Sequence, residues 1–253
     1  MLKLASTIGP IDAGIVNALE DAYKQKTGIH IVHTAAGSGR ALQLAETGEY
    51  DLVLVHAKTL EEKFIRDGFG TQRYDLMYND FVILGPQSDP SGISMSDNAA
   101  AAFRMIAKTQ APFITRGDNS GTHIKELEIW SMAKITPSGA WYIVSEHGSK
   151  STASTLMDAD SRQAYTIMDR ATYITLKSKL KLRILVEKDE ILLNYMTLIP
   201  VNPAKFPKVN YKEAIRFIEW LQSREAQMII RDFGRDKYNE LLFFPNSPEG
   251  KKL

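Results

Sequence analysis

The chain has 253 residues, enough for one large domain or two domains of ordinary size with a substantial core. Its composition, 44% hydrophobic and 24% charged, is typical of globular proteins, and a net charge of +1 provides no electrostatic field for nucleic acid. The absence of cysteine excludes disulfides, thiolate metal sites and cysteine nucleophiles.

Other classes of protein are excluded by pattern. No stretch approaches the roughly 18 apolar residues that a membrane-spanning helix needs. The five histidines show no metal-ligand spacing, so no metal site is predicted. Residues 1–6 lack the apolar region of a signal peptide, which fits either a cytosolic protein or the mature form of an exported one.

The chain opens with a predicted strand and a helix. Leu2–Ala5 reads as a buried strand, and Ser6 and Thr7 follow it. Asp12 is the predicted N-cap of the next helix, and Gly28 ends that helix. These elements place two hydroxyls at the carboxyl end of the first strand.

A second and a third strand follow with the same alternation. Residues 29–34 form a predicted strand, and Ser38 lies between two glycines just before a short helix. Asp51–His56, with the apolar run Leu52–Val55 at its centre, reads as a continuous buried strand of the parallel type. The alternation predicts α/β layers around mostly parallel sheets.

Two later segments read as crossings between domains. Met77–Pro86 and Leu192–Pro203 are long and apolar, and a separate set of α/β units lies between them. The chain is therefore predicted to leave a first domain, residues 1–82 plus 200–253, and to build a second one, residues 83–199. Two strands that cross between lobes make a natural hinge.

The segment that follows Phe113–Thr115 carries the clearest chemical signal. Arg116 begins a glycine-containing turn, and an apolar pattern of Ile124, Leu127 and Trp130 predicts a helix after it. Free N–H groups at a helix start attract anions, and an arginine adds a fork that suits paired oxygens. The pattern predicts a cradle for a small anion.

Several stretches, in order along nearly the whole chain, match one known family. They are Gly28-Ile29, Gly37–Leu42, Leu52–His56, Met77–Ile83, Arg116–His123, Trp141-Tyr142, Tyr165-Thr166, Asp169-Arg170 and Val201–Pro203. Together they resemble the periplasmic solute-binding proteins of tungstate ABC importers. The resemblance implies a two-lobed type II periplasmic-binding-protein fold, in which each lobe is a mostly parallel sheet flanked by helices and two crossing strands form the hinge.

This resemblance implies a function and its partners. The protein is expected to be a non-catalytic, extracytoplasmic or periplasmic monomer that captures tungstate or molybdate between its lobes by hinge closure. It would deliver the anion to a membrane ABC permease, without a cofactor and without nucleic acid.

The protein groups expected to bind the anion are hydroxyls, amides and one arginine, in loops that follow the carboxyl ends of strands. Several of them have a competing structural interpretation: an ion pair with Asp118 or another carboxylate for Arg116, an ordinary turn for Ser38, simple packing for Tyr165, and helix capping for the hydroxyls of the first strand and of the Arg116 turn. The expected ligand-binding residues are Ser6, Thr7, Ser38, Arg116, Ser120, Gly121 and Thr122, with Ser151, Thr152 and Tyr165 as secondary candidates.

Differences from the family's usual sequence, and other classes of protein, leave alternative functions open. The family usually has Thr-Thr-Thr-Ser in its first binding loop, whereas this chain has Ser6–Gly9, so another anion such as sulfate, phosphate or an organic anion is an alternative ligand. A ligand-sensing regulatory domain and a hydrolase that uses Ser120 or Ser38 are alternative functions. Neither a DNA-binding segment nor a Gly-x-Ser-x-Gly motif is present to support them.

Overall fold

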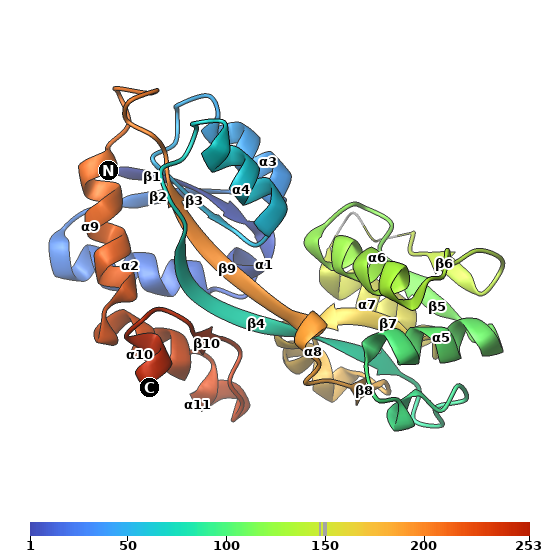
Figure 1. Cartoon of the computed structure of the whole chain (residues 1–253). Helices are drawn as coiled ribbons and strands as arrows, with labels where there is room; N and C mark the ends of the chain where they lie inside the picture. The colour runs from blue at the N-terminus through green and yellow to red at the C-terminus, as the bar shows by residue number, and fades with distance from the viewer. Residues whose placement is uncertain (147, 149–150) are drawn as a thin grey trace. The chain divides into compact units, whose positions relative to one another are not determined.

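The chain forms two compact units (Figure 1). The structure, a computed structural model, describes residues 1–146, 148 and 151–253. Unit 1 comprises Met1–Tyr78 and Tyr195–Leu253, and unit 2 comprises Asn79–Asn194. The chain passes from unit 1 to unit 2 within strand β4 (Tyr74–Gly85) and returns within strand β9 (Leu193–Pro200). The predicted boundaries, at 82/83 and 199/200, fall in the same two strands.

Unit 1 is built on a sheet in the order β10-β4-β9-β3-β1-β2. Its central strands are parallel, because β1 pairs in parallel with β2 and with β3, whereas β9 is antiparallel to β3. All four residues of β3 are buried, as expected for a strand covered on both faces. The strands not yet given are β1 (Leu2–Thr7), β2 (Ile31–Ala36), β3 (Leu52–Val55) and β10 (Phe244–Pro245).

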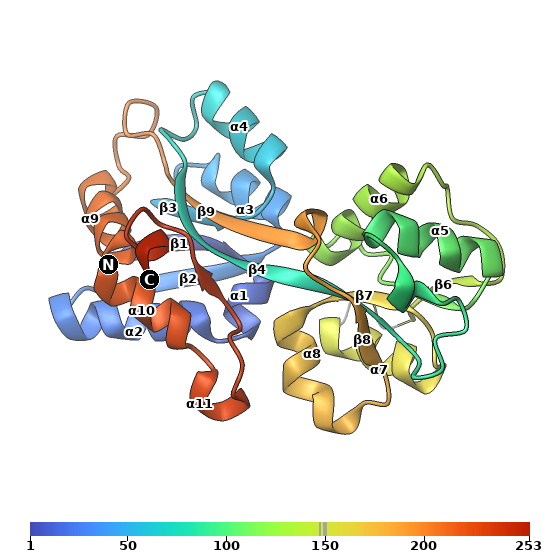
Figure 2. The same cartoon turned by 60° about the horizontal axis from the view of Figure 1, so that its bottom comes forward.

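Helices cover both faces of this sheet. Figures 1 and 2 show α3 and α4 on one face, with α2, α9 and α10 on the other. In the part of the chain that the structure describes, no helix has the length and apolar character to cross a membrane. The helices of unit 1 are α1 (Ile8–Asp12), α2 (Ile15–Thr27), α3 (Ser38–Ala45), α4 (Lys58–Arg66), α9 (Tyr211–Gln222), α10 (Arg224–Asp232), α11 (Arg235–Tyr238) and a 3-10 turn, Gly250–Lys252.

The prediction for the first helix was wrong in one respect. Asp12 is not an N-cap but the last residue of the short helix α1, and the N-cap of α2 is Gly14, which has a left-handed φ of 89°. A glycine takes this conformation without steric cost, so the chain turns sharply between the two helices. Strand β1 also extends through Ser6 and Thr7 rather than ending at Ala5.

Unit 2 has a smaller pair of sheets. The second half of β4 pairs antiparallel with β7 and β8, and β5 pairs in parallel with β6. The strands are β5 (Phe113–Thr115), β6 (Tyr142–Val144), β7 (Thr166–Asp169) and β8 (Arg183–Val186). The helices are α5 (Ala99–Thr109), α6 (Gly121–Ala133), α7 (Thr152–Ser161), α8 (Arg170–Leu176) and 3-10 turns at Ile93–Met95, Lys177–Lys179 and Glu190–Leu192.

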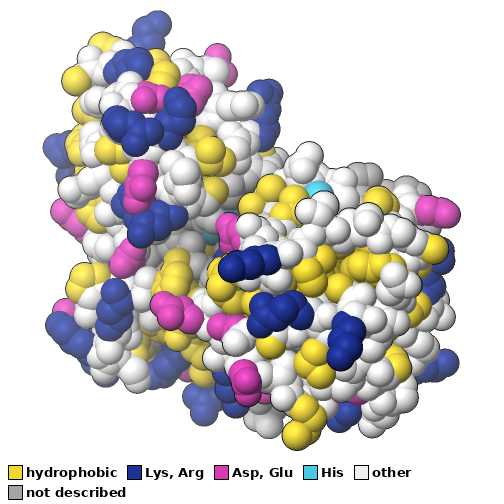
Figure 3. Space-filling model, turned by 45° about the vertical axis from the view of Figure 1, so that its right-hand side comes forward, with side chains coloured by type: hydrophobic (Ala, Val, Ile, Leu, Met, Phe, Trp, Pro, Cys, Tyr) yellow, Lys and Arg dark blue, Asp and Glu magenta, His cyan; other side chains and the backbone are white. Residues whose placement is uncertain are grey.

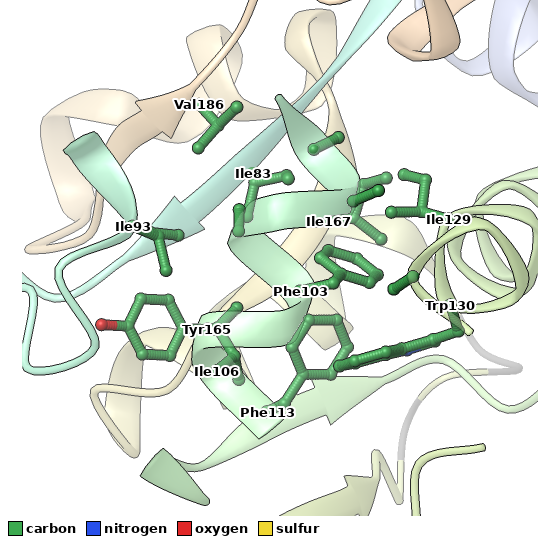
Figure 4. Packing of buried hydrophobic residues seen from close by; sticks show 14 of the residues in the cluster. Ile83, Ile93, Phe103, Ile106, Phe113, Ile129, Trp130, Tyr165, Ile167 and Val186 are labelled. Carbon is green, nitrogen blue, oxygen red and sulfur yellow. The ribbon is translucent and has the colours of Figure 1, made fainter. Parts of the chain in front are cut away.

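An aromatic cluster anchors α6 to this unit. The Trp130 ring lies 4.3 Å from the Phe103 ring and 5.4 Å from the Phe113 ring, measured between centroids, and Figure 4 shows the three packed together. Contacts of this kind are worth about 0.5–1.5 kcal/mol each beyond the area that they bury. The start of α6 is therefore held at a fixed place beside the end of β5.

The buried face of α6 differs from the predicted one. Ile124 and Leu127 were expected to line it with Trp130, but they are 45% and 40% exposed. The helix turns Glu126 inward instead, where the carboxylate accepts hydrogen bonds from Trp130 Nε1 at 3.1 Å and from the Tyr142 hydroxyl at 2.6 Å. A pattern of apolar residues could not reveal this face, because a polar residue occupies its centre.

Candidate functional site

In unit 1, two candidate hydroxyls lie at the carboxyl ends of neighbouring parallel strands. Thr7 is the last residue of β1 and pairs with Ala36, the last residue of β2. Ser38 follows two residues later as the first residue of α3. The first intrahelical bond of α3 is donated by Ala41 to the Gly37 carbonyl, at 2.8 Å, so the N–H groups before it lack an intrahelical acceptor.

Both hydroxyls are buried without a hydrogen-bond partner. Thr7 Oγ1 and Ser38 Oγ are among the few buried side-chain atoms, within the described residues, that have none. Thr7 occupies the N-cap position of α1, yet its hydroxyl makes no capping bond. Leaving such a group unpaired costs about 1–3 kcal/mol. A polar ligand at this carboxyl edge of the parallel sheet would satisfy both unpaired donors.

The neighbouring groups are already engaged. The Ser6 hydroxyl donates to the Thr7 carbonyl at 3.2 Å. After β3, the Ala57 N–H donates to Glu61 Oε1 at 2.6 Å, so this loop does not offer that amide. The unit 1 group therefore consists of Thr7, Ser38 and the first turn of α3.

In unit 2, Arg116 follows β5 and is already hydrogen-bonded within the protein. Its side chain is 9% exposed. Nε and Nη2 donate to Asp118 Oδ2 at 3.1 and 2.6 Å, Nη2 also donates to the Gly148 carbonyl at 2.9 Å, and Nη1 donates to the Thr152 hydroxyl. A guanidinium has five N–H donors, so one N–H on Nη1 is left without a partner among the described residues.

Glycines make this arrangement possible at two points. Gly117 has a φ of 63°, and a Cβ there would lie 2.7 Å from Val144 Cγ1. At Gly148 a Cβ would lie 2.1 Å from the Arg116 carbonyl oxygen. Only glycine lets the two backbones approach so closely that the Gly148 carbonyl accepts from the guanidinium.

Asp118 links the arginine to the start of α6. Its Oδ1 accepts from the Ser120 N–H at 3.1 Å, while Oδ2 accepts from Arg116. The Ser120 hydroxyl caps α6 by accepting from the His123 N–H at 3.5 Å. Gly121 and Thr122 form the first turn of the helix, where backbone N–H groups have no intrahelical acceptor.

The secondary candidates fall into two groups. Ser151 caps α7 and accepts from the Ser154 N–H at 3.0 Å, and Thr152 begins that helix beside Arg116. Tyr165 lies elsewhere: its hydroxyl donates to Asp89 Oδ1 at 2.8 Å and accepts from the Ser91 N–H at 2.9 Å. Figure 4 shows its ring in the core cluster with the oxygen directed away from it. The structure does not bring Tyr165 to the Arg116 group.

Sequence reasoning missed two carboxyl groups with raised pKa values near this loop, one fully buried and one half-buried. Burial raises the pKa of Glu126 to about 7, although hydrogen bonds from Tyr142, Thr115 and Trp130 oppose the effect. Burial also raises the pKa of Asp169, whose oxygens accept from the Thr172 N–H and hydroxyl at 2.8 and 2.7 Å. The signal for Glu126 was its place four residues before Trp130, which puts both on one helix face.

The net charge of +1 gives the protein no strong overall field that would attract anions. On the face shown in Figure 3, basic and acidic side chains are interspersed with apolar ones. Across residues 1–146, 148 and 151–253, no group of three or more His, Cys, Asp or Glu side chains is arranged to hold a metal ion. Selectivity for an anion must therefore come from the local donors described above.

Comparisons with known proteins agree with these features. A family model described as the PBP superfamily domain matches residues 3–225. The tungstate-binding protein TupA of Peptoclostridium acidaminophilum is 42% identical over 246 residues, 96% of this chain and 85% of that protein. The TupA of Campylobacter jejuni is 33% identical over 227 residues, 88% of this chain and 83% of that protein. The solved structure of TupA from Desulfovibrio alaskensis G20 has a TM-score of 0.87 and 39% identity, and the match covers 97% of this chain and 98% of that one.

Proposed function

The chain belongs to the PBP superfamily and, within it, to the periplasmic solute-binding proteins of tungstate ABC transporters, and from this we propose that it captures tungstate for import. In this proposal a tetrahedral oxyanion accepts hydrogen bonds from the protein, and a membrane permease receives the anion. The protein works outside the cytoplasm, as a monomer and without catalysis.

The observation that carries the proposal is the pair of buried, unpartnered hydroxyls of Thr7 and Ser38. An oxyanion has acceptor oxygens and no donors, so it would satisfy both hydroxyls and the free N–H groups at the start of α3. Hydrogen bonds to a charged acceptor are worth about 1.5–3 kcal/mol, more than bonds between neutral groups. A binding role also explains why these hydroxyls are left unpaired.

Titration calorimetry on two variants tests this role. Thr7→Val and Ser38→Ala each remove one hydroxyl and should weaken tungstate binding by about 10- to 100-fold. Thr71→Val is the matched control, because Thr71 Oγ1 is also buried without a partner in unit 1. The Thr71 N–H donates a hydrogen bond to the Pro200 carbonyl, and Pro200 pairs with Leu52 at the start of β3. Thr71 therefore lies at the amino end of the parallel strands, opposite to the carboxyl end where Thr7 and Ser38 lie. This variant should bind tungstate normally.

The outcome that would overturn the proposal is equally direct. Wild-type protein should release or absorb heat with tungstate, and competition with molybdate, sulfate and phosphate should rank the anions. If none of the four produced a binding isotherm, the protein would not be an oxyanion-binding protein. Turnover of a generic ester that disappeared in Ser120→Ala would instead favour the hydrolase.

A further inference from the structure

Asp118 holds two parts of the unit 2 loop at once. Its Oδ2 accepts hydrogen bonds from both Nε and Nη2 of Arg116, and its Oδ1 accepts one from the Ser120 N–H just before α6. The Asp118 and Arg116 side chains are only 13% and 9% exposed, so water screens the pair weakly. All of these contacts lie within unit 2.

The opposite charges of Asp118 and Arg116 offset each other within the ion pair. Burial would raise the pKa of Asp118, but the hydrogen bonds from Arg116 and Ser120 outweigh it and hold the pKa below its ordinary value, so the carboxyl is ionised at neutral pH. Burial lowers the pKa of His123, which leaves that ring neutral; its Nδ1 accepts from the Asn119 N–H at 3.0 Å. The Asp169 carboxyl accepts hydrogen bonds from Thr172 at the start of α8; burial raises its pKa, and its electrostatic interaction with Arg116 opposes that effect.

We propose that Asp118 is a specificity-determining residue that sets how strongly this loop prefers dianions to monoanions of the same tetrahedral shape. By balancing the charge of Arg116 it leaves neutral hydroxyl and N–H donors, together with the remaining Nη1 donor, to bind the anion. The inference rests on the proposed function, because it requires that an oxyanion contacts the Arg116 loop.

Coulomb's law gives the inference a quantitative signature. The energy between a fixed charge and an anion is proportional to the charge of the anion. If the negative charge of Asp118 is removed, the association constant of a monoanion rises by some factor, and that of a dianion rises by the square of the factor. The ratio of the two dissociation constants therefore changes, whereas a uniform loosening of the loop leaves the ratio unchanged.

The test compares tungstate with perrhenate, a tetrahedral monoanion, by calorimetry at mildly alkaline pH. In Asp118→Asn, the ratio of the perrhenate to the tungstate dissociation constant should rise by about tenfold. The double variant Arg116→Gln with Asp118→Asn is neutral again, so its ratio should return to the wild-type value even if both anions bind more weakly. Asp158→Asn is the control: it removes the same charge from a carboxylate in α7 that is paired with Arg162, and it should leave the ratio unchanged.

A second measurement does not depend on perrhenate. Because the wild-type pair is neutral, the tungstate affinity of Asp118→Asn should fall more steeply with ionic strength than that of the wild type. Equal changes for both anions, or equal salt dependence in the two proteins, would overturn the inference and leave the proposed function intact. If the wild type bound no oxyanion at all, the proposed function would fail first. Circular dichroism establishes that each variant is folded.

Discussion

Glu126 is the residue whose chemistry departs most from its sequence context. It lies in α6, is 1% exposed and accepts hydrogen bonds from Trp130 and Tyr142. Burial raises its pKa to about 7, far above the ordinary value near 4.5. The folded protein therefore binds this proton more tightly than the unfolded chain does.

The raised pKa makes stability depend on pH. The contribution of the Glu126 proton is fully present below the unfolded pKa of about 4.5 and is lost as pH rises through about 7, a loss on the order of 3 kcal/mol. Glu126→Gln stays neutral, so its unfolding free energy, measured by urea titration, should fall less across this pH range than that of the wild type. Glu128→Gln, an exposed position on the same helix, is the control; a difference between wild type and Glu126→Gln that did not change with pH would contradict the assignment.

Strand β5, the turn that follows it and α6 together fix the positions of Arg116, Asp118 and Ser120. The aromatic cluster holds the helix, and the left-handed residues Gly117 and Asn119 bring the chain from the strand to the helix start. Arg116 and Ser120 both donate hydrogen bonds to Asp118 across this turn. A change in the backbone of the turn therefore moves both the Arg116 side chain and the Ser120 N–H.

Gly117→Ala should disturb this element more than an ordinary glycine substitution. A Cβ at Gly117 combines a φ of 63° with a contact of 2.7 Å to Val144, so we expect a loss of about 2–3 kcal/mol of unfolding free energy. Gly28→Ala has a similar φ of 74° but nothing within 4 Å, and it should cost only about 1 kcal/mol. Equal losses for the two variants in urea titrations would show that the Val144 contact relaxes freely.

At the scale of the whole molecule, two units are joined by two strands. β4 carries the chain out of unit 1 and β9 brings it back, and a buried hydrogen bond of 2.8 Å links Asn194 on β9 to Asn79 on β4 where the units meet along the chain. Closure of the units by bending at these strands stays a prediction of the sequence analysis.

Ligand binding should stabilise the whole chain. At about a hundred times the dissociation constant, an anion that binds only the folded state adds about 2.7 kcal/mol, which for a chain of this size raises Tm by about 5–10 °C. Differential scanning calorimetry with tungstate should show this shift, and Thr7→Val should show a smaller one at the same concentration. Identical shifts in the two proteins would place the anion away from Thr7.

Helices and strands could be predicted from the sequence where an apolar pattern marked a buried strand or a glycine marked the end of a helix. The parallel strands around Leu4 and Val53 and the helix stop at Gly28 agree with the structure, because a buried strand must be apolar and a helix end favours a left-handed glycine. The predictions of Asp12 as an N-cap and of the buried face of α6 were wrong. The turn at Gly14 determines where α2 begins, and the buried carboxylate of Glu126 determines which face of α6 packs inward.

The sequence by itself determined the family, the α/β class and the loops that carry polar donors, since these depend on the order of residues along the chain. Only the tertiary structure decided what each donor does. Arg116 meets Gly148 and Thr152, more than 30 residues away in sequence, whereas Thr7 and Ser38 meet no partner in the described residues. Hydrogen-bond partners depend on which groups folding brings together in space, and this separates the donors that hold the Arg116 loop together from the hydroxyls that remain unpaired.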